Sequence, residues 1–348
     1  MAAENQARWQ TGRVVEATPV AIGIQRIVLQ TQNPQRAAPG SHVDVVVDIG
    51  GRADTRPYSV VASSDEGRLL TISVHLAPQS RGGSVFMHRL KPGDSIEMTQ
   101  PLQNFPLRVG AERYVLLAGG VGITAIAETA RVLRRLKSDY LLVYVGRSRD
   151  RMAYLKELQQ LHGERIRVHV DDEGTSLDAA ALVDEVAAAE STELYMCGPI
   201  RLMDAVRRRW QDRDLPAANL RYETFGNSGW YEPEEFVVAV PGLGIETTVE
   251  TGQSILQALE GAGVDVMSDC RKGECGLCQV KVLGIQGHVD HRDVFFSDEQ
   301  KKDSRGVCVC VSRAVPDTAT AAGTVTGKNA PVATLPTGNR AVLTLDIP

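Results

Sequence analysis

The sequence of 348 residues predicts three consecutive folded parts: an antiparallel β-barrel, an α/β domain with a parallel sheet, and a small β-rich domain. Three observations predict this order. Short β-branched runs fill residues 1–108, strands alternate with helices over residues 109–226, and three of only six cysteines cluster in residues 270–278. A single core rarely grows past about 250–300 residues, so the length also favours several domains.

The barrel is expected in residues 1–108. Runs of β-forming residues recur there, and the turns between them carry Pro-Gly pairs, as at Pro39-Gly40 and Pro92-Gly93. Short strands at this spacing are typical of a small antiparallel barrel. The expected strands are GRVVEATPV, IQRIVLQT, HVDVVVDI, YSVVAS, LLTISVHLA and DSIEMTQP.

The α/β domain is expected in residues 109–226. Buried strands alternate there with segments of helical periodicity, of which TAIAETARVLRRLKSD is the first. Such alternation predicts a parallel sheet covered on both faces, with ligands bound beyond the carboxyl ends of its strands. The expected strands are RYVLLAGG, YLLVYVGR, RIRVHVDD and ELYMCGP.

Residues 227–233 are expected to form a linker and residues 234–348 a third domain. Its expected strands are FVVAV, IETTVE, CQVKVLG and AVLTLDI, with SILQALEGAG as a helix. Residues 316–338 are rich in Ala, Thr, Gly and Pro and predict a flexible insertion. From Glu234 onward there are 15 acidic and 10 basic residues, which suits docking with a protein partner or an ordinary solvated surface.

Composition excludes several classes of partner. The net charge of −5 gives no reason to expect nucleic acid or an anionic membrane. No apolar run approaches the roughly 20 residues that cross a bilayer, and the first residues do not resemble a signal peptide. We therefore expect a cytoplasmic protein, in which clustered cysteines more often bind metal than form disulfides.

Cys270, Cys275 and Cys278 form a C-x₄-C-x₂-C run. With a distant fourth cysteine, this is the spacing of a plant-type [2Fe–2S] site. Gly273 and Gly276 would let the backbone wrap the cluster with its N–H groups directed at sulfur. A zinc site more usually shows two separated C-x₂-C pairs, so zinc and free thiols are the less favoured alternatives.

The fourth cysteine ligand is either Cys308 or Cys310. Residues two apart in a strand face the same side, so the pattern alone does not choose between them. The sixth cysteine, Cys197, lies in the turn YMCGP after the last expected strand of the α/β domain. Taken alone, Cys197 would be interpreted as a small buried hydrophobic residue.

Two segments of the barrel suit a flavin. In RPYS (residues 56–59), Arg56 can hold a phosphate, Tyr58 can lie against a flat ring, and Ser59 can hydrogen-bond a ring nitrogen. In RGGS (residues 81–84), the glycines free backbone N–H groups for an anion.

Two further segments suit a nicotinamide dinucleotide. The loop GGVGIT (residues 119–124) joins a strand to a helix, where a pyrophosphate would meet the helix N-terminus. Asp171 ends the strand RIRVHVD and could accept hydrogen bonds from ribose hydroxyls, which favours NADH over NADPH. Capping or simple exposure is the alternative for Asp171, and the nearby Arg147 and Arg149 could favour NADPH.

These segments together resemble the phthalate dioxygenase reductase and vanillate O-demethylase reductase family. DHRDVFFSDEQKKDSRGVCVCVSRA is similar to the end of its plant-type ferredoxin module, which has a β-grasp-like fold. RPYS, RGGS, GGVGIT and YMCGP are similar to its flavin and nicotinamide segments, although Ala125 stands where the family commonly has Pro. The resemblance covers nearly the whole chain and fails over residues 316–338.

The resemblance implies roles for individual residues. It makes Cys310 the fourth iron ligand and Cys308 an extra thiol, and it makes Ser59, Cys197 and Phe225 the residues nearest the reacting rings. Phe225 would cover the flavin until nicotinamide displaces it, unless it is an ordinary core residue. The residues implied for FMN are Arg56, Tyr58, Ser59, Gly82, Gly83 and Ser84, and those implied for NADH are Gly119, Gly120, Gly122, Thr124, Asp171, Cys197 and Gly198.

The implied function is a relay from NADH through FMN to a [2Fe–2S] cluster and on to a separate Rieske-type oxygenase acting on an aromatic compound. NADH gives two electrons together whereas the cluster takes one, and a flavin can stand between them. Plant-type clusters typically lie near −400 mV, so we expect a higher potential here. A partner-independent flavin reductase and a non-enzymatic zinc module are the alternatives.

Overall fold

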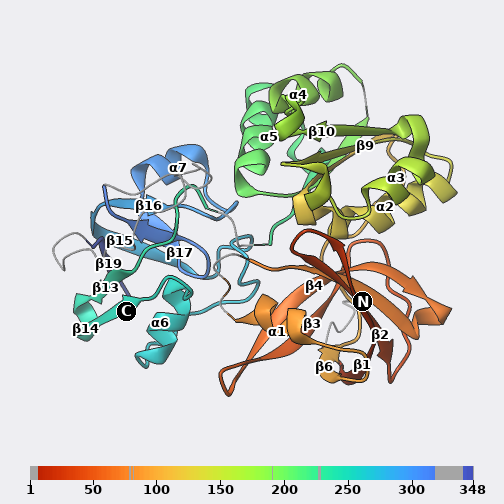
Figure 1. Cartoon of the computed structure of the whole chain (residues 1–348). Helices are drawn as coiled ribbons and strands as arrows, with labels where there is room; N and C mark the ends of the chain where they lie inside the picture. Colours follow the sequence, from red (N-terminus) through yellow and green to blue (C-terminus); the bar gives the residue numbers. More distant parts are fainter. Residues whose placement is uncertain are drawn as a thin grey trace, which may run out of the picture. The chain divides into compact units, whose positions relative to one another are not determined.

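The computed structural model describes residues 7–77, 80, 82–189, 191–225, 229–317 and 340–347. The chain divides into two compact units, Met1–Glu223 and Thr224–Pro348 (Figure 1). The first unit contains the barrel and the α/β domain, and the second contains the cysteine-rich domain. The predicted boundaries at residue 108 and within residues 227–233 stay predictions.

The barrel consists of six antiparallel strands in the order β4-β5-β2-β1-β6-β3, and it closes because β3 also pairs with β4. The predicted barrel is thus confirmed. The short helix α1, which begins at the second glycine of RGGS, was not predicted. Bounds in this part are β1 (Trp9–Ala21), β2 (Ile24–Thr31), β3 (Ser41–Ile49), β4 (Arg52–Ser64), β5 (Leu69–His75), α1 (Gly83–Arg89), β6 (Ser95–Thr99) and β7 (Leu102–Gln103).

Alternation along the strands builds the barrel core. Alternate residues point to opposite faces of a strand, so one set of aliphatic side chains fills the interior. β7 extends the sheet beside β3. The fully buried side chains of this core include Ile27, Leu29, Val45, Leu70 and Ile72.

The α/β domain holds five parallel strands in the order β10-β9-β8-β11-β12. The predicted parallel sheet is confirmed, while β12 was too short to be recognised. The strand order changes direction between β8 and β11, which is where such sheets bind ligands. Bounds are β8 (Arg113–Gly119), α2 (Ile123–Arg135), β9 (Asp139–Gly146), α3 (Leu155–His162), β10 (Ile166–Val170), α4 (Ala179–Ala187), β11 (Thr192–Cys197), α5 (Ile200–Asp212) and β12 (Leu220–Glu223).

The second unit is a mixed sheet in the order β14-β13-β19-β15-β17, with a separate pair β16-β18. The expected last strand is β19, which lies between β13 and β15. Most of the predicted insertion, residues 318–338, lies outside the described residues. Bounds are β13 (Phe236–Val240), β14 (Ile245–Val249), α6 (Ile255–Gly261), β15 (Gln279–Gln286), β16 (His288–Asp290), α7 (Asp298–Asp303), β17 (Gly306–Cys308), β18 (Arg313–Val315) and β19 (Val342–Asp346).

A capping box begins α6: the Ser254 hydroxyl accepts from the Gln257 N–H, and the Gln257 side chain accepts from the Ser254 N–H. The apolar face of α6, with Ile255, Leu256 and Leu259, joins the core under the sheet. This arrangement agrees with the predicted β-grasp-like domain. Across the described parts of the chain, no helix is both long enough and apolar enough to span a membrane.

Candidate functional site

Two glycine-containing turns meet at the carboxyl edge of the parallel sheet. β8 and β11 are neighbours, with Ala118 opposite Cys197. A Cβ atom on Gly122 would lie 2.1 Å from the carbonyl oxygen of Cys197, and one on Gly198 would lie 3.1 Å from the Cα atom of Gly119. The two turns therefore pack backbone against backbone, and no larger residue fits at Gly122 without displacing a turn.

The middle of the GGVGIT loop is open by contrast. Gly120 has a φ of +54°, and a Cβ atom placed on it would meet nothing within 4 Å. Thr124 is 2% exposed, and its hydroxyl donates to the carbonyl of Val121 at 2.9 Å. The loop thus has a tightly packed base and an accessible crest at Gly120. Its predicted contacts with a pyrophosphate stay a prediction.

Cys197 ends β11 and is 1% exposed. Protein atoms cover its thiol in this structure. The predicted role of Cys197 toward the nicotinamide stays a prediction.

Acidic side chains dominate the loop after β10, where Asp171 accepts a hydrogen bond from the Ser176 hydroxyl at 2.7 Å. Arg149, from the loop after β9, forms a two-pronged ion pair with Glu173, with N–O distances of 2.6 and 2.9 Å. Hydrogen bonding to Arg149 lowers the pKa of Glu173, so both partners are charged. This pairing engages one of the arginines that could have favoured a 2′-phosphate.

The predicted flavin segment RPYS lies in the middle of β4. The Arg56 guanidinium is ion-paired with Asp54 at 2.6 Å, and a Cβ atom on Gly83 would lie 3.1 Å from Cγ of Arg56. RPYS and the start of α1 are therefore neighbours, as a shared phosphate site requires. Tyr58 is half-buried against the barrel core, and burial raises the pKa of its phenol.

The turn before α1 is held by serine hydroxyls. The Ser84 hydroxyl donates to Ser80 at 2.8 Å and accepts from the Ala77 N–H at 3.2 Å, while the Gly82 N–H donates to Ser80 at 3.1 Å. Arg81, the first residue of RGGS, lies outside the described residues. The predicted contacts of Gly82, Gly83 and Ser84 with a phosphate stay predictions.

A buried carboxylate that the sequence analysis missed reaches the flavin segment. Glu223 is the last residue of β12 and is 3% exposed; the Ser59 hydroxyl donates to its Oε2 at 3.3 Å. Ser59 itself is 6% exposed. The hydrogen bond joins the middle of β4 to the carboxyl edge of the parallel sheet. The one feature of the sequence that could have indicated this role was the position of Glu223 at the end of a short run of β-forming residues.

Further contacts dock the barrel against the α/β domain. Arg131 of α2 donates to the carbonyl of Val61 at 3.0 Å, and the Tyr154 and Ser73 hydroxyls are 2.6 Å apart. On the barrel side, Val61 and Ser73 both follow Ser59 in the chain, on β4 and β5. These bonds hold β4, the predicted flavin strand, beside the carboxyl edge of the parallel sheet, where the GGVGIT loop begins.

The cysteine loop of the second unit wraps around one sulfur. Sγ of Cys270 accepts from the N–H groups of Lys272, Glu274 and Cys275 at 3.4, 3.5 and 3.4 Å. Gly273 makes this turn possible with a φ of +76°, and a Cβ atom there would lie 2.9 Å from Cα of Asp293. N–H groups directed at sulfur are what an iron–sulfur site requires.

The thiols of this region contact one another in two places, and Cys308 also approaches the second of them. Cys270 is hydrogen-bonded to Cys275, and the sulfurs of Cys278 and Cys310 are 3.1 Å apart. Hydrogen bonds from Cys308 and then Cys310 lower the pKa of Cys278 to about 3. In the described part of the chain, no three His, Cys, Asp or Glu side chains converge as ligands of one metal ion. Two thiol pairs nevertheless suit a centre of two irons, so these residues fit a [2Fe–2S] cluster.

A buried polar network supports the cysteine loop from the D-H-R-D segment. Arg292 pairs with Asp290 at 2.6 Å and donates to the carbonyl of Tyr231 at 3.2 Å. Asp293 is fully buried and accepts from the Ser312 hydroxyl at 3.2 Å and the Phe296 N–H at 2.9 Å. The buried charges are therefore either ion-paired or hydrogen-bonded, as burial requires.

Phe225 is half-buried and belongs to the second unit. Its neighbour Thr224 is anchored within that unit, where the Thr224 hydroxyl donates to the carbonyl of Lys272 at 2.8 Å and to Glu274 at 2.8 Å. The predicted covering of the flavin by Phe225 stays a prediction, since the barrel belongs to the first unit.

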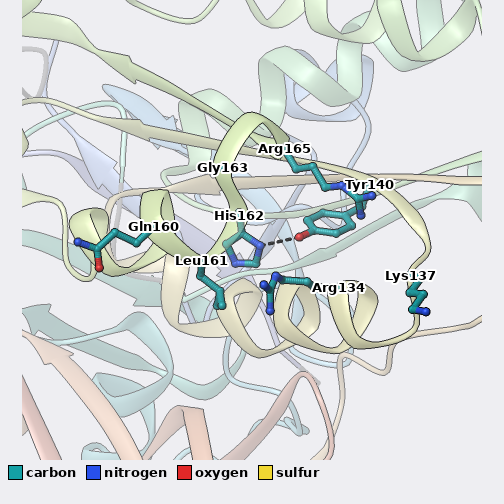
Figure 2. Close-up of a pocket in the computed structure, with 8 residues that line it drawn as sticks. All are labelled: Arg134, Lys137, Tyr140, Gln160, Leu161, His162, Gly163 and Arg165. Atoms are coloured by element: carbon teal, nitrogen blue, oxygen red, sulfur yellow. Dashed lines mark hydrogen bonds between the residues drawn. The ribbon is translucent and has the colours of Figure 1, made fainter.

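A pocket of about 520 Å³ opens at the opposite, amino-terminal edge of the parallel sheet (Figure 2). Its polar centre is the hydrogen bond of 2.6 Å between the Tyr140 hydroxyl and Nδ1 of His162, with Arg134 and Arg165 at the rim. Burial, and then the nearby arginines, lower the pKa of His162 to about 4. None of the residues predicted to bind a cofactor lines this pocket.

Comparison with known proteins identifies the family of each of three segments of the chain. Three family models match it: an oxidoreductase FAD-binding domain at residues 11–106, an oxidoreductase NAD-binding domain at residues 116–208, and a 2Fe-2S iron-sulfur cluster binding domain at residues 238–315. These matches cover the barrel, the α/β domain and the cysteine-rich domain in that order.

Individual relatives align over most of the chain. The carnitine monooxygenase reductase subunit of Acinetobacter baumannii is 31% identical over 87% of this chain and 93% of its own. The phenoxybenzoate dioxygenase subunit beta of Ectopseudomonas oleovorans is 35% identical over 78% of this chain and 83% of its own. The solved structure of phthalate dioxygenase reductase superposes with a TM-score of 0.68 and 27% identity, over 97% of this chain and 98% of its own.

Proposed function

Because the chain belongs to the phthalate dioxygenase reductase family, we propose that it carries electrons from NADH through FMN and a plant-type [2Fe–2S] cluster to a separate Rieske-type oxygenase. The chain is an oxidoreductase with flavin-, NAD- and [2Fe–2S]-binding domains. A flavin held by the barrel would supply the means to accept the two electrons of a hydride and release them one at a time. The residues of this chain position and shield those groups.

The Ser59–Glu223 hydrogen bond carries the proposal. It joins β4, the predicted flavin strand, to the carboxyl edge of the parallel sheet, where the predicted nicotinamide loop begins. We propose that Glu223 orients the Ser59 hydroxyl by accepting its hydrogen bond, which leaves the hydroxyl oxygen to accept a hydrogen bond from a ring N–H of the flavin. The buried position of both side chains excludes water from this point.

The nicotinamide dinucleotide is proposed to lie over the crest of the GGVGIT loop. The open space at Gly120 admits a pyrophosphate, while the packing of Gly122 against Cys197 holds the loop in place. Asp171 would accept from the adenosine ribose. The Arg149–Glu173 pair supports NADH, because an arginine already bound to a carboxylate is a poor partner for a 2′-phosphate.

The cofactor preference has a direct test. We expect kcat/KM to be higher with NADH than with NADPH. Asp171→Asn should lower the ratio of these two kcat/KM values about tenfold, because the carboxylate both binds the ribose and repels a 2′-phosphate. Asp172→Asn, a neighbouring exposed carboxylate, is the matched control. If Asp171→Asn and Asp172→Asn gave the same NADH-to-NADPH ratio of kcat/KM, Asp171 would not contact the ribose.

The flavin is proposed to be FMN. Arg56 and the start of α1 are adjacent, so the guanidinium and the backbone of Gly82, Gly83 and Ser84 can share one terminal phosphate. Heat release of the flavin followed by chromatography tests this directly. Recovery of FAD would contradict the proposal while leaving the flavin domain intact.

The cluster ligands are proposed to be Cys270, Cys275, Cys278 and Cys310. The thiol pairs and the three N–H bonds to Cys270 support this set. The final acceptor is proposed to be a Rieske-type oxygenase that acts on an aromatic acid or a methoxylated or sulfonated aromatic compound. Relatives named as reductase or dioxygenase subunits support a multicomponent oxygenase.

The deciding experiment is an anaerobic titration with NADH, followed by visible absorbance and low-temperature EPR. Bleaching of the flavin together with a reduced [2Fe–2S] signal is expected. Bleaching without that signal would contradict the relay. Turnover with candidate oxygenases then distinguishes a dedicated reductase from a general flavin reductase, since only the former prefers one oxygenase over free dyes.

A further inference from the structure

Tyr144 is a fully buried tyrosine of β9 whose hydroxyl reaches the crest of the GGVGIT loop. The hydroxyl oxygen lies 3.4 Å from the carbonyl oxygen of Gly120 and 3.1 Å from the carbonyl oxygen of Ala153. A tyrosine hydroxyl has one proton to donate, so the two carbonyls share it. Burial raises the pKa of the Tyr144 phenol, which keeps that proton in place. The crest is therefore hydrogen-bonded from inside the domain.

The carbonyl of Gly120 is also held from a second side. The N–H of Ile123 donates to it where the loop enters α2. The peptide between Gly120 and Val121 is trans, so its C=O and its N–H point in opposite directions. Because the C=O points at the buried Tyr144 hydroxyl, the N–H of Val121 points toward the open side of the crest. The first N–H groups of a helix have no partner within that helix, so this N–H can donate to a ligand.

The same peptide is the part of the loop that could most easily turn over. Gly120 has a φ of +54°, and an added Cβ atom there would meet nothing within 4 Å. A peptide next to glycine rotates at little steric cost. If it turned over, it would present a carbonyl oxygen to the crest and would repel a phosphate. The Tyr144 hydroxyl opposes this rotation, because the rotated peptide would lose its hydrogen bond.

The other partner of the hydroxyl belongs to a segment that docks against the barrel. Ala153 precedes Tyr154, whose hydroxyl is 2.6 Å from the hydroxyl of Ser73 in β5. The carbonyl of Asp150, in the same segment, accepts from the N–H of Ile22 in the barrel at 2.8 Å. The Tyr144 hydroxyl therefore ties the crest of the loop to a segment that is itself fixed on the barrel.

We propose that Tyr144 is a positioning residue for the nicotinamide dinucleotide: its hydroxyl holds the Gly120–Val121 peptide with the N–H directed at the pyrophosphate. This inference rests on the proposed NADH site and deepens it. Because Tyr144 is fully buried, it acts through the loop and does not touch the dinucleotide.

The test compares Tyr144→Phe with Tyr140→Phe in the full-length holoprotein. Tyr140 is the matched control, because it lies on the same strand, is 3% exposed, and hydrogen-bonds His162 at the opposite edge of the sheet. Both changes remove one hydrogen-bonded hydroxyl and keep the ring that fills the core. Both variants should therefore fold, with similar falls in Tm. Isothermal titration calorimetry with NAD⁺ gives the dissociation constant without any turnover.

We expect Tyr144→Phe to bind NAD⁺ about three- to tenfold more weakly, which is the value of about one hydrogen bond, and Tyr140→Phe to bind it unchanged. The dissociation constant of ADP-ribose, which has the pyrophosphate but no nicotinamide, should rise by the same factor. In reduction of the flavin by NADH, KM should rise while kcat stays within about twofold, because a pyrophosphate contact is equal in the ground and transition states.

Equal dissociation constants for NAD⁺ in the two tyrosine variants would overturn the proposal. A lower kcat with an unaltered KM in Tyr144→Phe would also overturn it, because the hydroxyl would then act on the chemical step. Weaker binding of NAD⁺ without weaker binding of ADP-ribose would overturn it as well, since the effect would lie at the nicotinamide. If the unaltered protein bound no NAD⁺, the proposed NADH site would be wrong and the inference with it, so the two failures are distinguishable.

Discussion

Gly122 in the first unit and Gly273 in the second each lie where an added Cβ atom would strike a neighbouring backbone, at 2.1 Å and 2.9 Å respectively. Their backbone conformations differ. Gly122 has a φ of −58°, which any residue adopts, whereas Gly273 has a φ of +76°. Position 122 of the GGVGIT loop therefore needs glycine for space alone, whereas position 273 of the cysteine loop needs it for both space and conformation.

The difference shows how each loop is built. The GGVGIT loop is fixed by packing against the turn after β11, and its crest at Gly120 is open. The cysteine loop is fixed by N–H groups that converge on Cys270 and by the buried network around Asp293. We expect the first loop to tolerate loss of its ligand, and the second to depend on its metal.

The largest effect is expected from Cys270→Ser. This change removes a proposed iron ligand. It also removes the sulfur on which three backbone N–H groups converge, so the loop loses both a metal ligand and its main hydrogen-bond acceptor. We expect no [2Fe–2S] absorbance and little iron. NADH should still bleach the flavin, because the first unit is unaltered. A variant that retains the cluster would show that the proposed ligand set is wrong.

The second prediction separates two glycines within the cysteine loop. Gly273→Ala is expected to cost about 2–4 kcal/mol, because positive φ and contact with the Asp293 backbone both oppose it. Gly276→Ala shares the positive φ but meets only the ring of Phe295, which is 41% exposed and can turn aside. We expect a much lower iron-to-protein ratio for Gly273→Ala. Equal iron content in the two would show that the backbone contact is unimportant.

The third prediction makes the same comparison in the nicotinamide loop. Gly122→Ala forces the two turns apart, and we expect a loss of about 1–3 kcal/mol in stability and about 10- to 100-fold in kcat/KM with NADH. Gly120→Ala has free space but a φ of +54°, and should cost about 1 kcal/mol. Melting curves and NADH kinetics check both. A raised KM in Gly120→Ala with little loss of stability would place the cofactor at the crest.

Sequence patterns predicted the elements with strong periodicity. The β-runs of the barrel and the alternation after Arg113 were recognised because hydrophobic residues there repeat with the period of the element. The short elements α1, β12 and α7 were missed, since four to seven residues carry too few repeats to show a period. Their positions depend on tertiary contacts.

The site was predictable where a motif is local and hidden where it is not. Cys270, Cys275 and Cys278 lie within nine residues, so their spacing alone indicates a cluster. The Ser59–Glu223 bond joins residues 164 positions apart, and nothing in either local sequence points to the other.

The smallest effect on stability is expected at the amino-terminal edge of the parallel sheet, away from both loops. His162 is 5% exposed and hydrogen-bonded to Tyr140, and its pKa falls to about 4 from an ordinary 6.5. Between these values the unfolded chain binds more protons than the folded one. The contribution of neutral His162 is therefore complete above about pH 6.5 and is lost as the pH falls toward about 4.

Because the pocket beside His162 is open to solvent, we expect the loss to be about 1–2 kcal/mol, which lowers the Tm by a few degrees. His162→Gln keeps a hydrogen-bonding side chain without titrating in this range, so its Tm should change less between about pH 7.5 and about pH 5. Melting curves of both proteins at the two pH values provide the measurement. An identical pH dependence in the variant would show that other groups control it. NADH kinetics of His162→Gln at the higher pH should match the unaltered protein, because this edge lies away from every residue proposed to bind a cofactor.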